Sequence, residues 1–227
     1  MNTQDGAKKR AAERAVELVE DGQIVGLGTG STSRFAIEAL ARRVKDGSTV
    51  RGVATSEATA QMARDLGIRV LDLNEVTAVD VTIDGADEVD AAFNMIKGGG
   101  GALTREKLVA LASRRRVYIV DETKLVERLG EHWPLPVEVL PFSYQHAKAS
   151  LAKLGSDPHL RLRGERPFET DNGNYIFDCR FNGIAEPEQM ERRVKLIPGV
   201  VECGLFVGIA DLLVIAWPDR VEVRERS

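Results

Sequence analysis

The strongest constraint on the fold is a regular alternation of short β-branched runs with helical patterns over residues 7–122. The patterns predict strands over 24–28, 49–55, 69–73, 79–85 and 116–122. They predict helices over 7–20, 33–47, 57–67 and 103–113, the first three ending close to a glycine. Helices between consecutive strands indicate right-handed βαβ units, so the sequence predicts an α/β fold with a mostly parallel sheet.

The character of the chain changes near residue 130, where three of the eight prolines fall within residues 132–141. Proline disfavours a regular helix there and suits a segment that crosses between domains. The patterns that follow predict helices over 143–155 and 186–199, and strands over 160–163, 175–181, 200–206 and 211–218. We therefore expect a first domain of residues 1–129 plus 206–227, the last segment adding a strand, and a small α+β domain of residues 130–205.

Composition excludes several classes of protein. The 227 residues carry a net charge of −4, and the short basic clusters 8–10 and 114–116 lack the interleaved aromatics of a nucleic-acid surface. No apolar run approaches the roughly 20 residues of a membrane span. We expect a cytoplasmic protein with no nucleic-acid or membrane partner. The spacing of the three histidines predicts no metal site, and Cys179 and Cys203 are expected to be reduced, half-buried thiols.

Four polar or glycine-rich turns follow predicted strands: 28–33, 55–59, 84–90 and 121–124. In open parallel sheets, ligands bind at the carboxyl ends of the strands, near the point where strand order reverses. All four turns are expected at this rim. The first, GTGSTS, offers backbone N–H groups and hydroxyls at a helix start, which favours an anion site; the alternative is a simple N-cap by Ser31 or Thr32.

The turn DGADEVD places Asp84, Asp87, Glu88 and Asp90 after a buried strand. Carboxylates held close together on a dry rim can divide acid and base roles. A solvated loop and a divalent cation site are the alternatives for this turn.

Residues 98–101 are four consecutive glycines, flanked by Lys97 and followed by Glu106 in the first turn of a predicted helix. Glycine gives up much backbone freedom on folding, but it lets exposed N–H groups approach a small ligand closely. Glu106 could instead only complement the helix dipole, and the glycines could form a flexible surface loop. The two flanking charges favour a binding site.

These motifs, with PLPVEV and IPGVVECGLF further along, occur in the order seen in type A ribose-5-phosphate isomerases, and the chain resembles that family from about residue 5 to residue 222. Gly101 is a small departure, because members often carry alanine there. The resemblance implies a Rossmann-like domain with a smaller ferredoxin-like domain, assembly as a homodimer or a dimer of dimers with the small domain at the subunit interface, and no metal or organic cofactor.

The resemblance also implies a reaction, the interconversion of D-ribose 5-phosphate and D-ribulose 5-phosphate, with Glu106 as general base. The implied substrate contacts are Thr29, Gly30, Ser31, Thr32, Asp84, Gly85, Ala86, Asp87, Lys97, Gly98, Gly99, Gly100 and Lys124, with Lys8 approaching the phosphate.

The residue chemistry fits this reaction. A carboxylate can shuttle a proton between neighbouring carbons through a cis-enediol(ate), and Lys97 with the glycine N–H groups can stabilise the oxyanion. Asp84 or Asp87 would assist ring opening, and the sequence leaves their roles open. It also leaves open whether Lys124 contacts phosphate or sugar hydroxyls. A phosphosugar sensor, an aminosugar-phosphate deaminase and a CoA transferase remain alternatives, because fold alone does not fix function.

Overall fold

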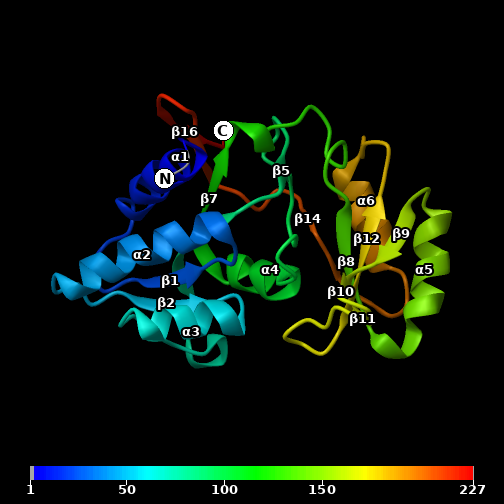
Figure 1. The fold of residues 1–227 in the computed structure, drawn as a ribbon, viewed down its shortest axis with the longest axis horizontal. Helices are drawn as coiled ribbons and strands as arrows, with labels where there is room; N and C mark the ends of the chain where they lie inside the picture. The colour runs from blue at the N-terminus through cyan, green and yellow to red at the C-terminus, as the bar shows by residue number, and fades with distance from the viewer. Residues whose placement is uncertain (1–2, 227) are drawn as a thin grey trace. The chain divides into compact units, whose positions relative to one another are not determined.

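The computed structural model describes residues 3–226, and by its internal contacts the chain divides into two units (Figure 1). The first unit comprises Met1–Ala86, Arg105–Lys124 and Ile209–Ser227, and the second Asp87–Thr104 and Leu125–Gly208. None of the described helices has the length and apolar character needed to span a bilayer.

The described part of the first unit holds a seven-stranded sheet in the order β16-β15-β7-β4-β1-β2-β3. Its strands are β1 (Ile24–Leu27), β2 (Arg51–Ala54), β3 (Arg69–Val70), β4 (Val79–Gly85), β7 (Ser113–Asp121), β15 (Leu212–Ala216) and β16 (Val221–Glu225). All neighbouring pairs are parallel except β15 and β16. The predicted α/β fold with a mostly parallel sheet is confirmed.

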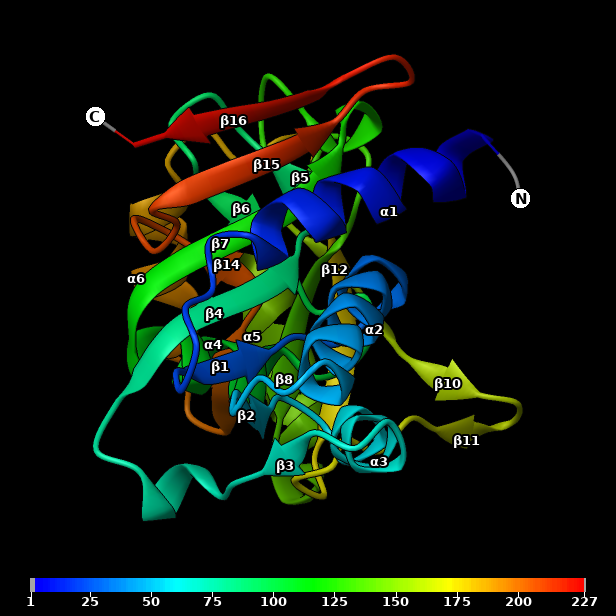
Figure 2. The same ribbon diagram turned by 90° about the vertical axis from the view of Figure 1, so that its left-hand side faces the viewer.

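Helices cover both faces of this sheet, which is why its inner strands are apolar on both sides. The helices are α1 (Thr3–Val16), α2 (Ser31–Lys45), α3 (Glu57–Asp65) and α4 (Leu103–Leu111), with 3-10 turns η1 (Leu73–Glu75) and η2 (Glu122–Lys124). Figure 2 shows α1 and α2 in front of the sheet, where they share one core with β1, β4, β7 and β15. Val109 of α4 packs with Val53 and Val79 in a separate cluster. Buried alanines at 7, 11, 12 and 15 let α1 pack closely.

The second unit contains a four-stranded antiparallel sheet in the order β13-β8-β12-β9. Its strands are β8 (Leu135–Val139), β9 (Asp157–Leu160), β12 (Tyr175–Arg180) and β13 (Val200–Cys203). Helix α5 (Tyr144–Lys153) follows β8, and helix α6 (Pro187–Lys195) follows β12 after the loop. The order β-α-β-β-α-β with this strand arrangement is ferredoxin-like, as the resemblance implied.

Smaller elements complete the second unit. A hairpin of β10 (Leu162–Arg163) and β11 (Arg166–Pro167) lies between β9 and β12, and the 3-10 turn η3 (Pro141–Ser143) precedes α5. A three-stranded sheet joins β5 (Glu88–Val89), β6 (Met95–Ile96) and β14 (Leu205–Phe206). Cys179 and Cys203 are both fully buried, not half-buried as predicted. Burial raises the pKa of Cys179 to about 12.

Several boundaries differ from those predicted. Residues 87–104 and 125–129, assigned to the first domain from the sequence, group with the second unit, because β5 and β6 pair with β14 and Ile96 lies in the second core. The segment after residue 206 adds two strands to the first sheet, β15 and β16, where one was expected. Strand β7 starts three residues early, since Ser113 already pairs with Val79.

Arg116 and Asp211 connect β7 to the start of β15 within the first unit. The Arg116 guanidinium donates from Nε and Nη2 to the two carboxylate oxygens at 2.7 Å each, and its backbone N–H donates at 2.8 Å. Burial acts to raise the pKa of Asp211, but the hydrogen bonds and charge of Arg116 outweigh it and hold that pKa below its usual range. A carboxylate with a depressed pKa stabilises the fold above its unfolded-state pKa, and that stabilisation disappears as the pH falls through its folded-state pKa.

We expect Asp211→Asn to reduce the free energy of unfolding at pH 7 by about 1 kcal/mol, a charged hydrogen bond discounted for partial exposure. The difference from wild type should shrink below about pH 4, where the wild-type carboxyl also becomes protonated. Urea unfolding of both proteins at several pH values measures this difference in the free energy of unfolding. Asp219→Asn is the control, because that carboxylate is 76% exposed and pairs with its neighbour Arg220. If Asp211→Asn lowered the free energy of unfolding equally at pH 7 and pH 3, the stabilisation would not come from the ionised Asp211 carboxylate.

Candidate active site

The strand order of the first sheet creates a reversal point beside β1. From β1 the chain continues to β2 and β3 on one side, and then crosses to β4 and β7 on the other. Loops that leave β1 and β4 in opposite directions open a crevice at the carboxyl edge, where ligands bind in such sheets. The turns after β1, β2, β4 and β7 lie at this edge, as predicted.

The loop after β1 presents an uncapped helix start. Gly30 is the N-cap residue of α2, with φ 124° and no side chain to accept the helix amides. Ser31 and Thr32 lie inside the first turn of the helix, so the simple N-cap alternative for them is wrong. The backbone N–H groups of this turn and the helix dipole are suited to an anion. Beside them lies a pocket of about 350 Å³ lined by residues 28–31 and by Arg34, Thr59 and Met62, among others.

Thr29 is held by hydroxyl groups of the turn after β2. Its Oγ1 lies 2.7 Å from Thr55 Oγ1, 2.9 Å from Ser56 Oγ and 3.1 Å from Thr59 Oγ1. Thr59 Oγ1 also donates to the carbonyl of Gly28 at 3.4 Å. The sequence analysis recognised residues 55–59 as a rim turn but did not predict that they bind the first loop.

Asp84 is the next-to-last residue of β4 and is buried, with 1% of its surface exposed. Its Oδ1 accepts hydrogen bonds from Ser33 Oγ at 3.1 Å and from the backbone N–H of Gly85 at 2.7 Å. The carboxylate fits because Gly28 has no side chain: a Cβ there would lie 2.0 Å from Asp84 Oδ1. Glycine at 28 therefore makes room for a buried carboxylate beside the loop of residues 28–33.

Glu106 lies in the first turn of α4, which connects the second unit back to β7. Only 3% of its surface is exposed. Because α4 ends at Leu111, close in sequence to the amino end of β7, its first turn points toward the carboxyl edge of the sheet. The Glu106 carboxylate is therefore shielded from water at this end of the helix.

Two lysines lie near the carboxyl end of β7. Lys8 of α1 has its Nζ 3.7 Å from Oδ2 of Asp121, the last residue of β7, and this carboxylate is 2% exposed. Asp121 also accepts hydrogen bonds from the backbone and hydroxyl of Thr123. Lys124 follows in η2 and is half-buried. The amino-terminal helix thus brings Lys8 to the same strand end as Lys124.

The second unit holds Asp87, Lys97 and the glycine loop. The backbone N–H of Gly99 donates to Asp87 Oδ2 at 2.8 Å. A Cβ on Gly99 would lie 2.8 Å from Asp87 Oδ1, so glycine is required for this contact. Lys97 is buried, its backbone N–H donates to the carbonyl of Gly204 at 2.9 Å, and its Nζ lies 5.4 Å from the ring centre of Phe206.

Arg161 fixes the glycine loop, and the sequence analysis missed it. Its Nη1 donates to the carbonyls of Gly98 at 2.9 Å and Gly99 at 3.2 Å, while Nε and Nη2 bind the carboxylate of Asp178. Arg161 lies more than sixty residues from the loop, so no local pattern pointed to it. The glycines are thus an ordered turn, and the flexible-loop alternative is wrong.

The remaining acids of the DGADEVD turn, Glu88 and Asp90, accept hydrogen bonds from backbone N–H groups. Glu88 accepts the N–H groups of Gly130, His132 and Trp133 at 2.5–2.7 Å. Asp90 accepts the N–H groups of Ala92 and Asn94. Within the part of the chain that the structure describes, one group of potential metal ligands is close enough to share an ion, Glu191, Glu202 and Cys203, and it includes none of the acidic turn.

The predicted residues are thus distributed over both units. The first unit carries Thr29, Gly30, Ser31, Thr32, Asp84, Gly85, Ala86, Glu106, Lys124 and Lys8, and the second carries Asp87, Lys97, Gly98, Gly99 and Gly100.

Comparison with known proteins identifies the family. A family model described as ribose 5-phosphate isomerase A (phosphoriboisomerase A) matches residues 51–220. The ribose-5-phosphate isomerase A of Gloeobacter violaceus is 54% identical over 220 residues, covering 96% of each chain. The chain belongs to the ribose-5-phosphate isomerase A family. The resemblance drawn from the motifs is confirmed, and with it an aldose–ketose isomerase of the pentose phosphate pathway.

Solved structures of the family share the whole fold. A ribose 5-phosphate isomerase A from Methanocaldococcus jannaschii superposes with a TM-score of 0.93 at 38% identity, covering 97% of this chain and 98% of that one. A D-ribose-5-phosphate isomerase in complex with phospho-erythronic acid gives a TM-score of 0.96 at 39% identity, and each chain is covered completely.

The approach of Gly28 to Asp84 gives a stability prediction. Gly28→Ala would place Cβ 2.7 Å from the Asp84 Cα as well as on its carboxylate. Backbone must move, so we expect the free energy of unfolding to fall by about 3 kcal/mol, the upper end of overpacking effects. Gly85→Ala is the matched control, because its Cβ would meet nothing closer than 3.7 Å. Urea unfolding compares them, and equal stability of the two variants would contradict the close-approach argument.

Proposed function

We propose that this chain interconverts D-ribose 5-phosphate and D-ribulose 5-phosphate through a cis-enediol(ate), with Glu106 as the general base. Glu106 takes the proton from C2 of the open-chain aldose and returns it to C1, while the C2 hydroxyl loses its proton and the C1 carbonyl oxygen gains one. One carboxylate on one face of the sugar is sufficient for this transfer. The observation that carries the proposal is the burial of Glu106, 3% exposed in the first turn of α4.

Burial supports the role of Glu106. Water is kept from the carboxylate, so the proton held between the two transfers is not lost to solvent. The alternative role of Glu106 is to complement the helix dipole. An exposed acid in the first helical turn would do this equally well, so that role does not explain why Glu106 is buried.

The proposal assigns the developing oxyanion to Lys97 and to the N–H groups of Gly98, Gly99 and Gly100. Donors that are fixed before the reaction stabilise charge without reorganisation. The contacts of Arg161 with the loop carbonyls support this assignment, because they hold the loop in one conformation.

Asp84 and Asp87 are assigned to the sugar hydroxyls and to ring opening. Each carboxylate accepts a backbone N–H, Asp84 from Gly85 and Asp87 from Gly99. Those bonds fix the position of each carboxylate. A carboxylate can accept a proton from the ring hydroxyl when the furanose opens, which supports a role as acceptors.

The phosphate is assigned to Thr29, Gly30, Ser31 and Thr32, with Lys8 and Lys124 supplying positive charge. The uncapped start of α2 supports this, because its amides lack a side-chain acceptor from the N-cap. A solved structure of a relative is described in complex with phospho-erythronic acid, which supports a phosphorylated ligand for the site as a whole. Binding energy from the unreactive phosphate can be used to orient the reacting carbons.

We also propose that the chain is a cytoplasmic homodimer whose subunits meet through the second unit. An exposed apolar surface there supports the assembly: Phe142 is fully exposed and Leu196 is 81% exposed. The backbone N–H of Leu140 donates to the carbonyl of Gly199 at 2.9 Å, so the two exposed side chains belong to adjoining turns. Grouped exposed apolar side chains mark protein interfaces.

Glu106→Gln tests the catalytic role. The substitution keeps the shape of the side chain and removes its basicity, so we expect kcat to fall by about 10²–10⁴-fold with little change in KM. Both constants are measured from the rate at which chelator-treated protein forms ribulose 5-phosphate from ribose 5-phosphate. Glu17→Gln is the control, because Glu17 is 64% exposed and pairs only with Arg14 across one helical turn.

More than about a tenth of wild-type turnover in Glu106→Gln would exclude Glu106 as the base. Loss of wild-type activity on chelation, restored by a divalent ion, would exclude the metal-free mechanism.

The assembly has its own test. We expect Phe142→Ser with Leu196→Ser to weaken self-association at least tenfold in sedimentation equilibrium, since both apolar side chains leave the proposed interface. Leu162→Ser is the control, a leucine 56% exposed on the β10–β11 hairpin. An unchanged dissociation constant would exclude this surface as the interface.

A further inference from the structure

The amino edge of the first sheet carries a row of charged side chains that the isomerase reaction does not use. Ile24 of β1 pairs with Arg51 of β2, which pairs with Arg69 of β3. On the other side of Ile24 lies Asp80 of β4, one residue before the Val25–Val81 pair. Directly paired residues in a sheet point to the same face. Asp80 and the two arginines therefore lie in one row, separated by the apolar Ile24.

The charges in this row are not balanced. Asp80 accepts the backbone N–H of Ile24 in β1 at 2.8 Å and pairs with Arg114 in β7 at 3.3 Å, so its carboxylate is already engaged by both neighbouring strands. Among the described residues, Arg51 donates a side-chain hydrogen bond to the carbonyl of Gly22, at 3.2 Å, and neither Arg51 nor Arg69 forms an ion pair. Like charges directly opposite on neighbouring strands destabilise a sheet. The two guanidinium groups thus lack a counter-charge in the described chain.

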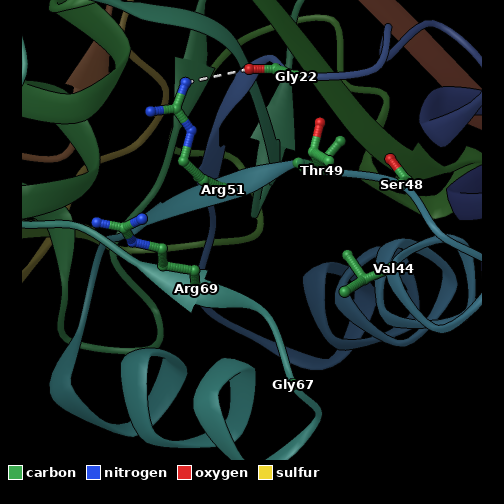
Figure 3. Close-up of a pocket in the computed structure, with 8 residues that line it drawn as sticks. Gly22, Val44, Ser48, Thr49, Arg51, Gly67 and Arg69 are labelled. Atoms are coloured by element: carbon green, nitrogen blue, oxygen red, sulfur yellow. Dashed lines mark hydrogen bonds between the residues drawn. The ribbon is translucent and has the colours of Figure 1, made fainter.

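The two arginines line a pocket of about 430 Å³. Figure 3 shows both guanidinium groups on the same side of the strands, away from Val44 and Ser48. The hydroxyls of Ser48 and Thr49, on the α2 side of the pocket, both donate to the carboxylate of Asp21, so these two donors already have an acceptor. The arginine side is the part that offers unused N–H donors.

We propose that Arg51 and Arg69 form a binding site for a small phosphate monoester dianion, separate from the catalytic rim. A guanidinium presents its N–H groups in a planar fork that matches phosphate oxygens, and two of them supply the two positive charges that a dianion requires. The Arg51–Gly22 contact orients one fork in advance. Val44 and Val50 line the rest of the pocket and suit the less polar part of such a ligand.

The site lies at the opposite end of β2 from the substrate loop. Strand β2 runs from Arg51 to Ala54, and Thr55 immediately after it binds Thr29. At about 3.3 Å per residue, Arg51 and Thr55 are roughly 13 Å apart along the chain. The residues of the two sites do not overlap, so they can be tested separately.

Isothermal titration calorimetry with inorganic phosphate at low ionic strength tests the proposal. We expect wild-type protein to bind one equivalent more per chain than Arg51→Gln/Arg69→Gln, whose remaining binding belongs to the catalytic loop. Arg64→Gln is the matched control: it removes one exposed positive charge from α3 in the same unit and should keep the wild-type stoichiometry. Equal stoichiometry in wild type and the double variant would overturn the proposal.

The single variant Arg69→Gln tests the site even if the double variant fails to fold. Arg69 is exposed and its side chain makes no hydrogen bond among the described residues, so its replacement should not disturb the fold. Without phosphate, it should melt at or above the wild-type temperature, since one of two like charges is gone. Adding phosphate should raise the melting temperature of wild type and Arg64→Gln more than that of Arg69→Gln. An equal rise in all three would also overturn the proposal.

Discussion

The candidate site depends on the close approach of β1 and β4 at the end of the sheet. Gly28 leaves the space that the Asp84 carboxylate fills, and a single methyl group at that position would overlap it. Because the carboxylate is buried there, it is fixed by Ser33 and by the backbone of Gly85 and is not solvated. The same glycine-containing loop then starts α2 without a side-chain cap. Two glycines of this loop therefore have separate effects: Gly28 makes room for the buried acid, and Gly30 leaves the start of α2 without a side-chain cap.

Much of this arrangement could be predicted from local sequence. Alternating strands and helices predicted the parallel sheet, and the rule that ligands bind at the carboxyl ends of such strands predicted the rim. The motifs around Asp84, Lys97 and Glu106 predicted the family. Glycine, proline and charge signals act within a few residues of one another, which is why such features can be read without coordinates.

The parts that sequence missed depend on contacts between distant residues. Arg161 holds the glycine loop across more than sixty residues, and the hydroxyls of Thr55 and Thr59 hold Thr29 across a whole βα unit. Segment 87–104 was assigned to the first domain because its short strands carry little pattern, while its partner β14 lies about a hundred residues away. Pairings of this kind are decided by tertiary packing and leave no periodic signal.

The contacts that shape the loop around Thr29 are made by hydroxyl groups and backbone carbonyls alone. Threonine and serine hydroxyls do not ionise in water near neutral pH. The shape of that loop is therefore insensitive to acidity between about pH 5 and pH 8, a range in which a phosphate monoester passes through its second ionisation, near pH 6. Under the proposed function, acidification over this range changes the charge of the phosphate and leaves the shape of the loop that would bind it unchanged. The substrate, and not this loop, would then be the pH-sensitive partner in phosphate recognition.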